Sequence, residues 1–256
     1  MDFMHLAVQA AREGGRMARF HAGRVTEVGQ KKDRADLVTA IDREVETRLR
    51  EILLGACPDH AFFGEEHGAR GEGRHRWLVD PIDGTLNFVS GFPYYCTSVA
   101  LEVDGAIEVA ALYDPERDEL FTARRGHGAW LNGAPIKVTS TARLQDAMLA
   151  TGYNYRPDED EVRATMQRVT RVVARSRAVR RVGAAALDLA YVAAGRFDGF
   201  WEGGLNPWDV AAAWLLVEEA GGRMSDLDGA AFALNAPLVV ASNGVFHDEL
   251  LGALCD

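Results

Sequence analysis

Residues 77–88 read W-L-V-D-P-I-D-G-T-L-N-F, and this stretch bears on both the fold and the candidate site. The apolar run at 77–79 predicts a buried strand that delivers the chain to two aspartates, Asp80 and Asp83. Asp-Pro and Asp-Gly are common turn dipeptides, so a strand that ends in a turn is one interpretation. Two carboxylates followed by a glycine and a threonine are more than a turn requires, and they also suit a site for a cation and a phosphate.

The composition is that of a globular protein with a sizeable core. The chain has 256 residues, 48% of them hydrophobic and 26% charged, a length that permits one large domain or two small ones. Its formal net charge of −10 argues against nucleic-acid binding, because phosphate contacts need a basic surface. An anionic substrate would be repelled too, unless a bound cation reverses the local charge.

Cysteine usage and hydropathy favour a cytoplasmic protein. The three cysteines, Cys57, Cys96 and Cys255, form neither a C-x-x-C pair nor an even-numbered disulfide framework. The N-terminal segment has no basic leader followed by an apolar run, and no run of about 18 apolar residues occurs. We therefore expect no signal peptide, no membrane span and no membrane partner.

Helical and strand patterns alternate along the chain. Apolar spacings of three and four predict an amphipathic helix from Phe3 and a second helix after Thr39. Residues 61–139 change to short strand-like runs, with Asp104-Gly105 and Asn132-Gly133 between such runs as hairpin turns. Beyond residue 140, strands are expected near 148–152, 178–182, 197–203 and 238–242, with helices near 157–174, 184–195, 207–222 and at the C-terminus.

These patterns predict a layered α/β or α+β structure with a mixed sheet. We expect a single unit over residues 1–256 with two approximate halves. The first, residues 1–145, would contain a hairpin-rich sheet. The second, residues 146–256, would alternate strands and helices.

Acidic residues stand at the ends of apolar elements in three places. Glu65 and Glu66 follow an apolar pair, Asp80 and Asp83 follow the strand quoted above, and Asp209 begins an apolar helix. Taken singly, they could be a solvated turn, turn formers and a first-turn acid that suits the helix dipole. Carboxylates amid buried neighbours are unfavourable unless something neutralises them. Together, the three places match what an oxygen-only cation site would need.

The spacing of the two aspartates supports such a site. Across a proline, Asp80 and Asp83 can present both carboxylates and the Ile82 carbonyl to one side. Hard cations such as Mg²⁺ take ligands of this kind, completed by substrate phosphate. The seven histidines show no H-E-x-x-H spacing and no cysteine partner, which argues against zinc.

Gly84 and Thr85 can begin a helical turn whose free N–H groups attract a phosphate. The Thr85 hydroxyl could orient a water or cap the helix, and one hydroxyl can do both. Neither G-x-x-x-x-G-K-[ST] nor G-x-G-x-x-G occurs, so the loop is not one of these nucleotide-binding motifs.

Five blocks, in order along the chain, resemble the signatures of the inositol monophosphatase family, whose members are Mg²⁺-dependent, lithium-sensitive sugar-phosphate phosphatases. The blocks are D-L-V-T-A-I-D at 36–42, G-E-E at 64–66, D-P-I-D-G-T at 80–85, W-D-V-A-A at 208–212 and E-A-G-G at 219–222. The resemblance implies a layered α-β-α-β-α sandwich with two mixed sheets, and a homodimer.

The resemblance also implies the metal ligands. Glu65, Asp80 and the Ile82 carbonyl would hold a first metal, and Asp80, Asp83 and Asp209 a second. Glu65 would help to position a weaker third, so two or three Mg²⁺ ions are expected per site.

The same comparison implies how the attacking water and the phosphate are held. Thr85, paired with Asp42, would orient the water, with Glu65 as a further catalytic residue. The backbone N–H groups of Gly84 and Thr85 would hold the phosphate. Lys31 matches a family lysine near the site, although a solvated charge explains it equally well.

The residues that would contact the polyol map to Gly183, Ala184, Ala185, Glu202 and Asn206. Glu202 suits inositol because a carboxylate can accept from neighbouring hydroxyls, and it could equally be a surface acid at a strand end. Asn206 stands where the animal enzymes have a histidine, which leaves the polyol contact open.

The expected activity is Mg²⁺-dependent hydrolysis of inositol 1-phosphate, a small-molecule polyol phosphate. One alternative is a fructose-1,6-bisphosphatase or NADP phosphatase, for which Arg156, Arg180 or Arg181 could bind a second phosphate. Another is a non-catalytic regulatory protein that retains the fold.

Overall fold

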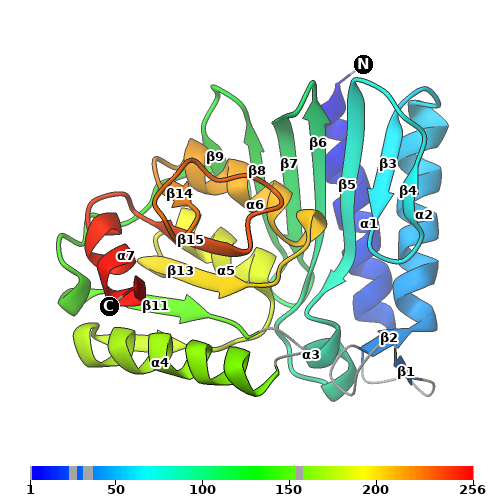
Figure 1. The fold of residues 1–256 in the computed structure, drawn as a ribbon. Helices are drawn as coiled ribbons and strands as arrows, with labels where there is room; N and C mark the ends of the chain where they lie inside the picture. Colours follow the sequence, from blue (N-terminus) through cyan, green and yellow to red (C-terminus); the bar gives the residue numbers. More distant parts are fainter. Residues whose placement is uncertain (1, 23–27, 31–36, 154–157, 256) are drawn as a thin grey trace.

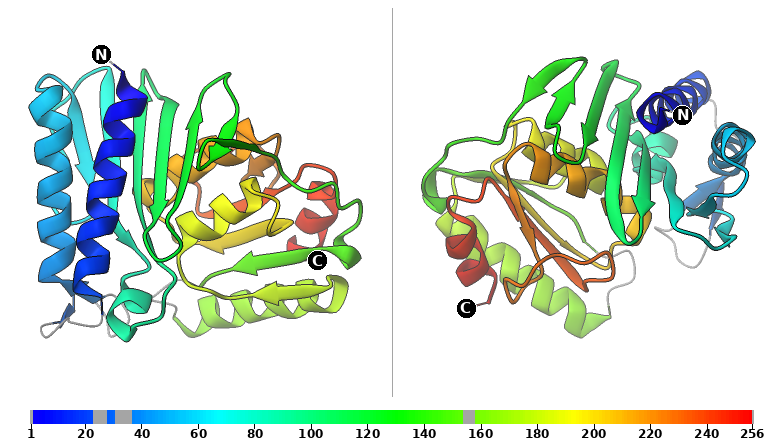
Figure 2. Two further views of the ribbon diagram at one scale, coloured as in Figure 1. Left: turned by 180° about the vertical axis from the view of Figure 1, so that it is seen from behind. Right: turned by 90° about the horizontal axis from the view of Figure 1, so that it is seen from above.

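The computed structural model describes residues 2–22, 28–30, 37–153 and 158–255. Within them, the chain builds two large mixed sheets with helices on both faces of each, as Figures 1 and 2 show. The order of layers is helices, sheet, helices, sheet, helices. The expected α-β-α-β-α sandwich with two mixed sheets is confirmed.

The first sheet has eight strands in the described residues, and its neighbouring strands are antiparallel except for β3 and β5. Both predicted hairpin turns are present: Asp104 and Gly105 join β6 to β7, Asn132 and Gly133 join β9 to β10, and all four have positive φ. In spatial order the strands are β10 (Ala134–Ile136), β9 (Ala129–Leu131), β8 (Glu119–Arg124), β7 (Ala106–Asp114), β6 (Cys96–Val103), β5 (His75–Asp83), β3 (Ala61–Gly64) and β4 (Gly68–Arg70).

The second sheet has five strands in the part of the chain that the structure describes. Its strand β11 runs parallel to both neighbours, whereas β13, β15 and β14 are antiparallel. In spatial order the strands are β12 (Ala178–Arg180), β11 (Met148–Thr151), β13 (Gly199–Gly203), β15 (Leu238–Ser242) and β14 (Arg223–Ser225). A separate short pair, β1 (Val28–Gln30) and β2 (Leu37–Thr39), is antiparallel.

Three pairs of helices form the other layers. The outer face of the first sheet is covered by α1 (Phe3–His21) and α2 (Ala40–Ala56). Between the sheets lie α5 (Ala185–Ala193) and α6 (Pro207–Glu219), and on the far side lie α4 (Glu159–Arg175) and α7 (His247–Cys255). Because α6 contacts strands of both sheets, it needs apolar residues around most of its circumference, which explains its sequence A-A-A-W-L-L-V.

Two short helices complete the described elements: α3 (Thr85–Ser90) and the 3₁₀ turn η1 (Leu144–Asp146). In the described part of the chain, no helix combines the length and apolar character needed to cross a membrane. The first sheet ends at β10 and the second begins at β11, on either side of residue 145, but α6 packs on both sheets. The division into two halves stays a prediction.

A β-bulge at the end of β5 shapes the candidate site. The register to β6 shifts between Asp80 and Asp83, so that Pro81 and Ile82 face the single residue Thr97. The Thr97 hydroxyl donates to the Pro81 carbonyl at 2.8 Å, and proline itself brings no N–H to the ladder. A bulge changes the direction in which the following side chains point. The strand therefore runs through both aspartates, and the turn begins only after Asp83.

A buried histidine fastens α7 to the second sheet. His247 has no exposed surface; its Nε2 lies 2.9 Å from Ser225 Oγ and its Nδ1 lies 2.8 Å from Ser242 Oγ. Ser225 Oγ also lies 2.7 Å from the Asp226 carbonyl, to which it donates. Because that hydroxyl has one proton, it accepts from His247, which is held as the neutral Nε2–H tautomer. Burial, helped by Arg223, lowers the pKa of His247 to about 4.

We expect this histidine to make the fold sensitive to acid. Its unfolded pKa is about 6.5, so below that pH the unfolded chain binds a proton that the folded chain excludes. Stability is complete above about pH 6.5 and declines as the pH falls toward 4. In urea unfolding at pH 7 and pH 5, His247→Gln should lose less stability between the two pH values than wild type. His127→Gln, at an exposed position, is the control, and an equal loss in all three proteins would contradict the assignment.

Candidate active site

The predicted acidic metal ligands and Asp42 meet where β5 ends and α3 begins, at the junction between the two sheets. Asp80 and Asp83 lie at the end of β5, Glu65 in the turn between β3 and β4, Asp209 in the first turn of α6 and Asp42 in the first turn of α2. Four segments that are remote in sequence thus deliver carboxyl groups to one place.

Burial and mutual repulsion dominate the electrostatics of this cluster. Burial, followed by the charges of Glu65, Asp83 and Asp209, raises the pKa of Asp80 well above its usual value, and the nearby Glu65 side chain also favours the protonated form as a hydrogen-bond partner. Burial and then Glu65 also raise the pKa of Asp209. Carboxyl groups so close together favour either bound protons or a bound cation.

Asp83 connects the two sheets through α5. Its Oδ1 accepts from the Ala185 N–H at 3.1 Å, and its Oδ2 accepts from the N–H groups of Ala186 and Leu187 at 2.9 and 3.3 Å. These donors belong to the first turn of α5, where the helix dipole favours negative charge. Burial raises the pKa of Asp83 to about 7, and the hydrogen bonds from Leu187 and Ala186 oppose the rise.

The predicted phosphate-binding loop and the predicted polyol turn are in contact at Gly84. A Cβ at this position would lie 3.1 Å from the Ala184 Cβ and from the Tyr94 carbonyl, and 3.3 Å from the Gly183 carbonyl. Gly84 also has a φ of 90°, which side chains disfavour. Glycine is therefore needed on both grounds, and it lets residues 183–185 approach the start of α3.

The hydroxyl of Thr85 reaches the partner that the family resemblance implied. Thr85 Oγ1 lies 3.0 Å from Asp42 Oδ1 and 3.0 Å from the Ile82 carbonyl. A hydroxyl has a single proton, so it donates to one of these acceptors at a time. When Thr85 donates to Asp42, the Ile82 carbonyl keeps its lone pairs for another partner.

Asp209 belongs to the acidic cluster and also stabilises the start of α6, as its position in the first turn of the helix suggested. Its Oδ2 accepts from the Asn206 N–H at 2.7 Å and lies 3.4 Å from the Asn206 side-chain nitrogen. This is the hydrogen bond of a capping box at the start of α6. The exposed Asn206 thereby orients the Asp209 carboxylate, and this role does not depend on a contact between Asn206 and a ligand.

Glu202 is buried, which excludes its interpretation as a surface acid. Burial, followed by Asp188 and Asp83, raises its pKa well above the usual value. The carboxylate lies over Gly152, where a Cβ would come within 2.0 Å of Glu202 Oε2. The end of β13 thus directs this carboxylate toward the other acids.

Two buried acids that contact the candidate site or its supporting helix were missed in the sequence. Asp188 accepts a 2.7 Å hydrogen bond from the Tyr94 hydroxyl, and burial raises its pKa to about 8. The sequence did contain a signal for Asp188, because this acid lies within the otherwise apolar helix pattern at 184–195. The second is Glu46, one turn after Asp42 on α2, which looked like one charge among many on a polar face.

The cationic candidates for a second phosphate differ in position. Arg181 lowers the pKa of both Asp188 and Glu202, so it lies near the predicted polyol residues. Arg180 donates to the Val179 carbonyl on the exposed edge strand β12. Arg156, like Lys31, lies outside the described residues.

The donor set has the chemistry of a hard-cation site, although the side chains are not arranged as a ready chelate. Among the described residues, no group of three or more His, Cys, Asp or Glu side chains is placed to hold a metal ion as it stands. Asp83 and Asp209 point oxygens at backbone N–H groups instead. Yet the donors are all carboxylate or carbonyl oxygens, which Mg²⁺ prefers, and positive charge would offset the repulsion that raises their pKa values.

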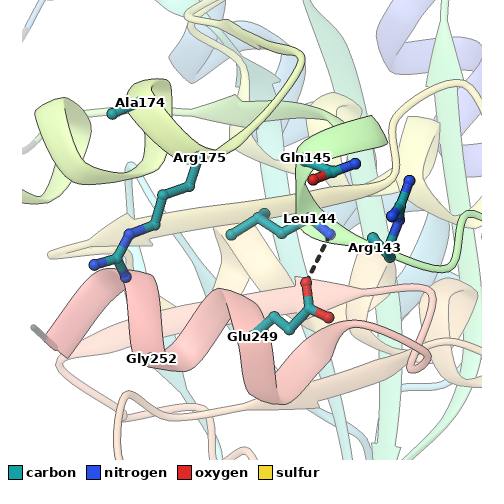
Figure 3. A pocket seen from close by; sticks show the side chains of 7 residues that line it. All are labelled: Arg143, Leu144, Gln145, Ala174, Arg175, Glu249 and Gly252. Atoms are coloured by element: carbon teal, nitrogen blue, oxygen red, sulfur yellow. Dashed lines mark hydrogen bonds between the residues drawn. The ribbon is translucent and has the colours of Figure 1, made fainter.

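A surface pocket of about 600 Å³ lies between η1, α4 and α7 (Figure 3). In it, the Glu249 carboxylate accepts from the Leu144 N–H at 2.9 Å, a bond that joins α7 to η1. Arg143 is paired with Asp146. The pocket contains none of the predicted site residues.

Comparison with known proteins identifies the family and agrees with the fold. The sequence profile of the inositol monophosphatase family matches residues 2–256. The chain is 42% identical to an inositol-1-monophosphatase of Mesorhizobium japonicum over 98% of this chain and 95% of that protein. It is also 42% identical to the Nus factor SuhB of Pseudomonas aeruginosa, over 97% and 94% of the two chains.

Solved structures give the same result. The extragenic suppressor protein SuhB of Bartonella henselae superposes with a TM-score of 0.95 at 40% identity, over 100% of this chain and 99% of that one. An inositol monophosphatase of Thermotoga maritima superposes with a TM-score of 0.91 at 35% identity, over 99% and 97%. The family match and the fold together define a phosphatase, a hydrolase of phosphoric esters. The chain belongs to the inositol monophosphatase family.

We expect Asp80→Asn to stabilise the protein in a chelator while weakening its response to Mg²⁺. The pKa of Asp80 is raised in the folded state, so the wild-type acid opposes folding increasingly as the pH rises above about 4. Asparagine removes that charge at equal size. At pH 8 in EDTA the melting temperature should rise by about 3–6 °C, equivalent to roughly 1–2 kcal/mol.

Scanning calorimetry checks this expectation, with Asp104→Asn as the control because Asp104 is exposed and bonded to Arg74. A fall in melting temperature for Asp80→Asn in EDTA would contradict this expectation. It would show that the Asp80 charge does not destabilise the folded protein through repulsion within the cluster.

Proposed function

We propose that the protein is a Mg²⁺-dependent phosphomonoesterase that hydrolyses inositol 1-phosphate to inositol and phosphate by direct attack of water. The observation that carries the proposal is the Thr85–Asp42 hydrogen bond directly beside the buried carboxylates of Asp80 and Asp83. A water-orienting hydroxyl and a cation-binding acid cluster are the two components that such hydrolysis needs.

In this proposal, two or three Mg²⁺ ions are held by Glu65, Asp80, the Ile82 carbonyl, Asp83 and Asp209. All five lie on the segments that converge at the end of β5. Bound Mg²⁺ supplies positive charge that offsets the negative charges of the ester and the acids, and it acidifies water. Family membership supports the choice of metal.

The chain's own residues then orient the attacking water and hold the phosphate. When Thr85 Oγ1 donates to Asp42 Oδ1, its lone pairs are available to accept an O–H from a water. The Asp42 carboxylate is fully buried and so keeps the hydroxyl in one orientation. The N–H groups of Gly84 and Thr85 hold the phosphate. No side chain forms a covalent bond to phosphorus, so no phosphoenzyme is expected.

For the polyol, we propose contacts from Glu202, from the turn formed by Gly183, Ala184 and Ala185, and from Asn206. Glu202 is the strongest of these, because its carboxylate is buried beside Asp83 and can accept hydrogen bonds from two hydroxyls. Inositol offers neighbouring hydroxyls at the required spacing.

Two alternatives have specific support. The position of Arg181 near Glu202 favours esters with a second phosphate, such as fructose 1,6-bisphosphate or NADP. The relatives named Nus factor SuhB favour a protein-binding role, with or without turnover. We rank both below inositol phosphatase activity, because the metal-binding carboxylates are complete and the inositol-1-monophosphatases are equally similar.

We also propose that the protein acts as a cytoplasmic homodimer and is inhibited by lithium. The homodimer and the lithium inhibition rest on the family alone, and the cytoplasmic location rests on the cysteine usage and the hydropathy.

We expect purified protein to release phosphate from inositol 1-phosphate only when Mg²⁺ is present. Thr85→Val should lower kcat by about 10²–10⁴-fold, the usual contribution of a positioned proton acceptor, whereas Thr85→Ser should retain most activity. Phosphate release would be measured on inositol 1-phosphate, fructose 1,6-bisphosphate, NADP, histidinol phosphate and 3′-phosphoadenosine 5′-phosphate. The preferred ester then identifies the substrate.

Asp83→Asn serves as the metal control, because asparagine keeps an oxygen for the α5 N–H groups but loses the charge. Absence of turnover on every ester, from protein that binds Mg²⁺, would refute the phosphatase and favour the protein-binding alternative.

A second expectation concerns the polyol. Gly152→Ala places a Cβ within 2.0 Å of the Glu202 carboxylate and must displace it. We expect KM for inositol 1-phosphate to rise about tenfold, equivalent to one lost hydrogen bond to a charged group, with a smaller change in kcat. Gly55→Ala, which meets no atom within 4 Å, is the steric control. An unchanged KM in Gly152→Ala would remove Glu202 from the polyol site.

A further inference from the structure

Glu46 is a completely buried acid to which none of the roles above is assigned. It lies four residues after Asp42 on α2, so the two side chains emerge from the same face of the helix, one turn apart. Burying a carboxylate is costly unless its oxygens are fully hydrogen-bonded. Its contacts therefore show what the carboxylate does.

The Glu46 carboxylate holds the turn between β3 and β4. Its Oε2 accepts from the Glu66 N–H at 2.7 Å, and its Oε1 accepts from the His67 N–H at 2.8 Å. The same Oε1 lies 2.7 Å from the His67 Nδ1. Three donors from two adjacent residues converge on one side chain of a different element.

This turn can close on the carboxylate only because residue 64 is glycine. A Cβ on Gly64 would lie 2.5 Å from the Glu46 carboxyl carbon and from Oε2. The β3–β4 ladder pairs Gly64 with Gly68, so Glu65, Glu66 and His67 form the whole connection. Two of its three N–H groups are bound by Glu46.

The residue that this connection carries is Glu65, the proposed metal ligand whose side chain lies beside Asp80. The other side chain on the same face of α2, Asp42, bonds to Thr85. A single helix thus sets the position of the Glu65 turn and of the Thr85 hydroxyl relative to each other. The β3–β5 ladder already holds the two segments together up to the pair Gly64 and Val79. Both the Glu65 turn and Thr85 lie beyond the end of that ladder, where α2 contacts each of them.

We propose that Glu46 is a positioning residue for the metal site: its carboxylate holds the turn that carries Glu65 in register with the Thr85–Asp42 pair. The catalytic part of this inference rests on the phosphatase function proposed above. The Mg²⁺-binding part does not need turnover. Glu46 acts through Glu65 and contacts neither substrate nor metal.

The rival explanation is that Glu46 only stabilises a turn, and the chain contains a matched example of that role. Glu219 on α6 accepts from the N–H groups of Gly126 and Gly128, both at 2.7 Å, and so holds the turn between β8 and β9. The chemistry is the same, a helical carboxylate that binds two N–H groups of a hairpin, but no proposed ligand lies in that turn. Glu219→Gln reports the cost of weakening such a bond away from the site.

The test compares Glu46→Gln, Glu46→Ala and Glu219→Gln with wild type. Mg²⁺ affinity would be measured by titration calorimetry and by the Mg²⁺-induced rise in melting temperature, with kcat and KM on the preferred ester alongside. We expect Glu46→Gln to weaken Mg²⁺ binding by about 10–100-fold, the usual effect of removing support for a metal ligand. Glu46→Ala should weaken it further, because glutamine keeps one acceptor oxygen.

The readouts separate positioning from stability. With Glu46→Gln, kcat should fall and recover in part at high Mg²⁺, while KM for the ester stays within about twofold. Glu219→Gln should lower the melting temperature without changing Mg²⁺ affinity. If Glu46→Gln loses stability but binds Mg²⁺ as tightly as wild type, Glu46 is a structural clamp and the proposal is overturned.

Two further outcomes are interpretable. If Glu46→Ala does not fold, Gly64→Ala disturbs the same contact from the turn side and should weaken Mg²⁺ binding in the same way. If wild type binds Mg²⁺ but cleaves no ester, the phosphatase proposal fails, and the Mg²⁺ titrations of the Glu46 variants still decide the positioning role.

Discussion

The molecule depends on the contact between the Asp83 carboxylate and the first turn of α5. Asp83 ends β5, an interior strand of the first sheet, and α5 lies between the sheets. Three N–H groups compensate the burial of this carboxylate, so the same bonds that join the layers also keep an acid at their junction. The position of α5 then brings Gly183 and Ala184 against Gly84. The predicted polyol turn and the predicted phosphate-binding loop are neighbours because one carboxylate caps one helix.

Around that contact lie several buried carboxyl groups, whose negative charge is unfavourable there because the site is buried and the groups repel one another. Asp80, Asp209 and Glu202 each have a raised pKa, with burial as the first cause and other acids among the rest. Such a cluster lowers stability unless protons or a cation compensate it, which is a common trade between stability and activity. Glycines allow it to form: at Gly64 and Gly152 a carboxylate lies where a Cβ would be.

Much of the fold and of the candidate site could be predicted from the chain alone. The hairpins at Asp104-Gly105 and Asn132-Gly133 are local, and positive φ is encoded by the residues themselves. The end of β5 was misjudged, because the bulge opposite Thr97 depends on how β6 pairs with it. Asp188 and Glu46 were missed, because an isolated acid on a helix gives no indication of which turn or tyrosine it will meet.

The sequence by itself determined most of the helices and strands, although not the short strands β4 and β14. It also determined that the candidate donors are oxygens and that D-P-I-D-G-T contains two of the acids. These features follow from periodicity and residue chemistry, which are properties of neighbours along the chain. Only the tertiary structure decided that Glu202 is buried beside Asp83, that Asn206 orients Asp209, and that Glu46 and Asp42 hold two separate segments from one helix. The reason is that burial and hydrogen-bond pairing arise between residues distant in sequence, and they exist only once the layers have packed.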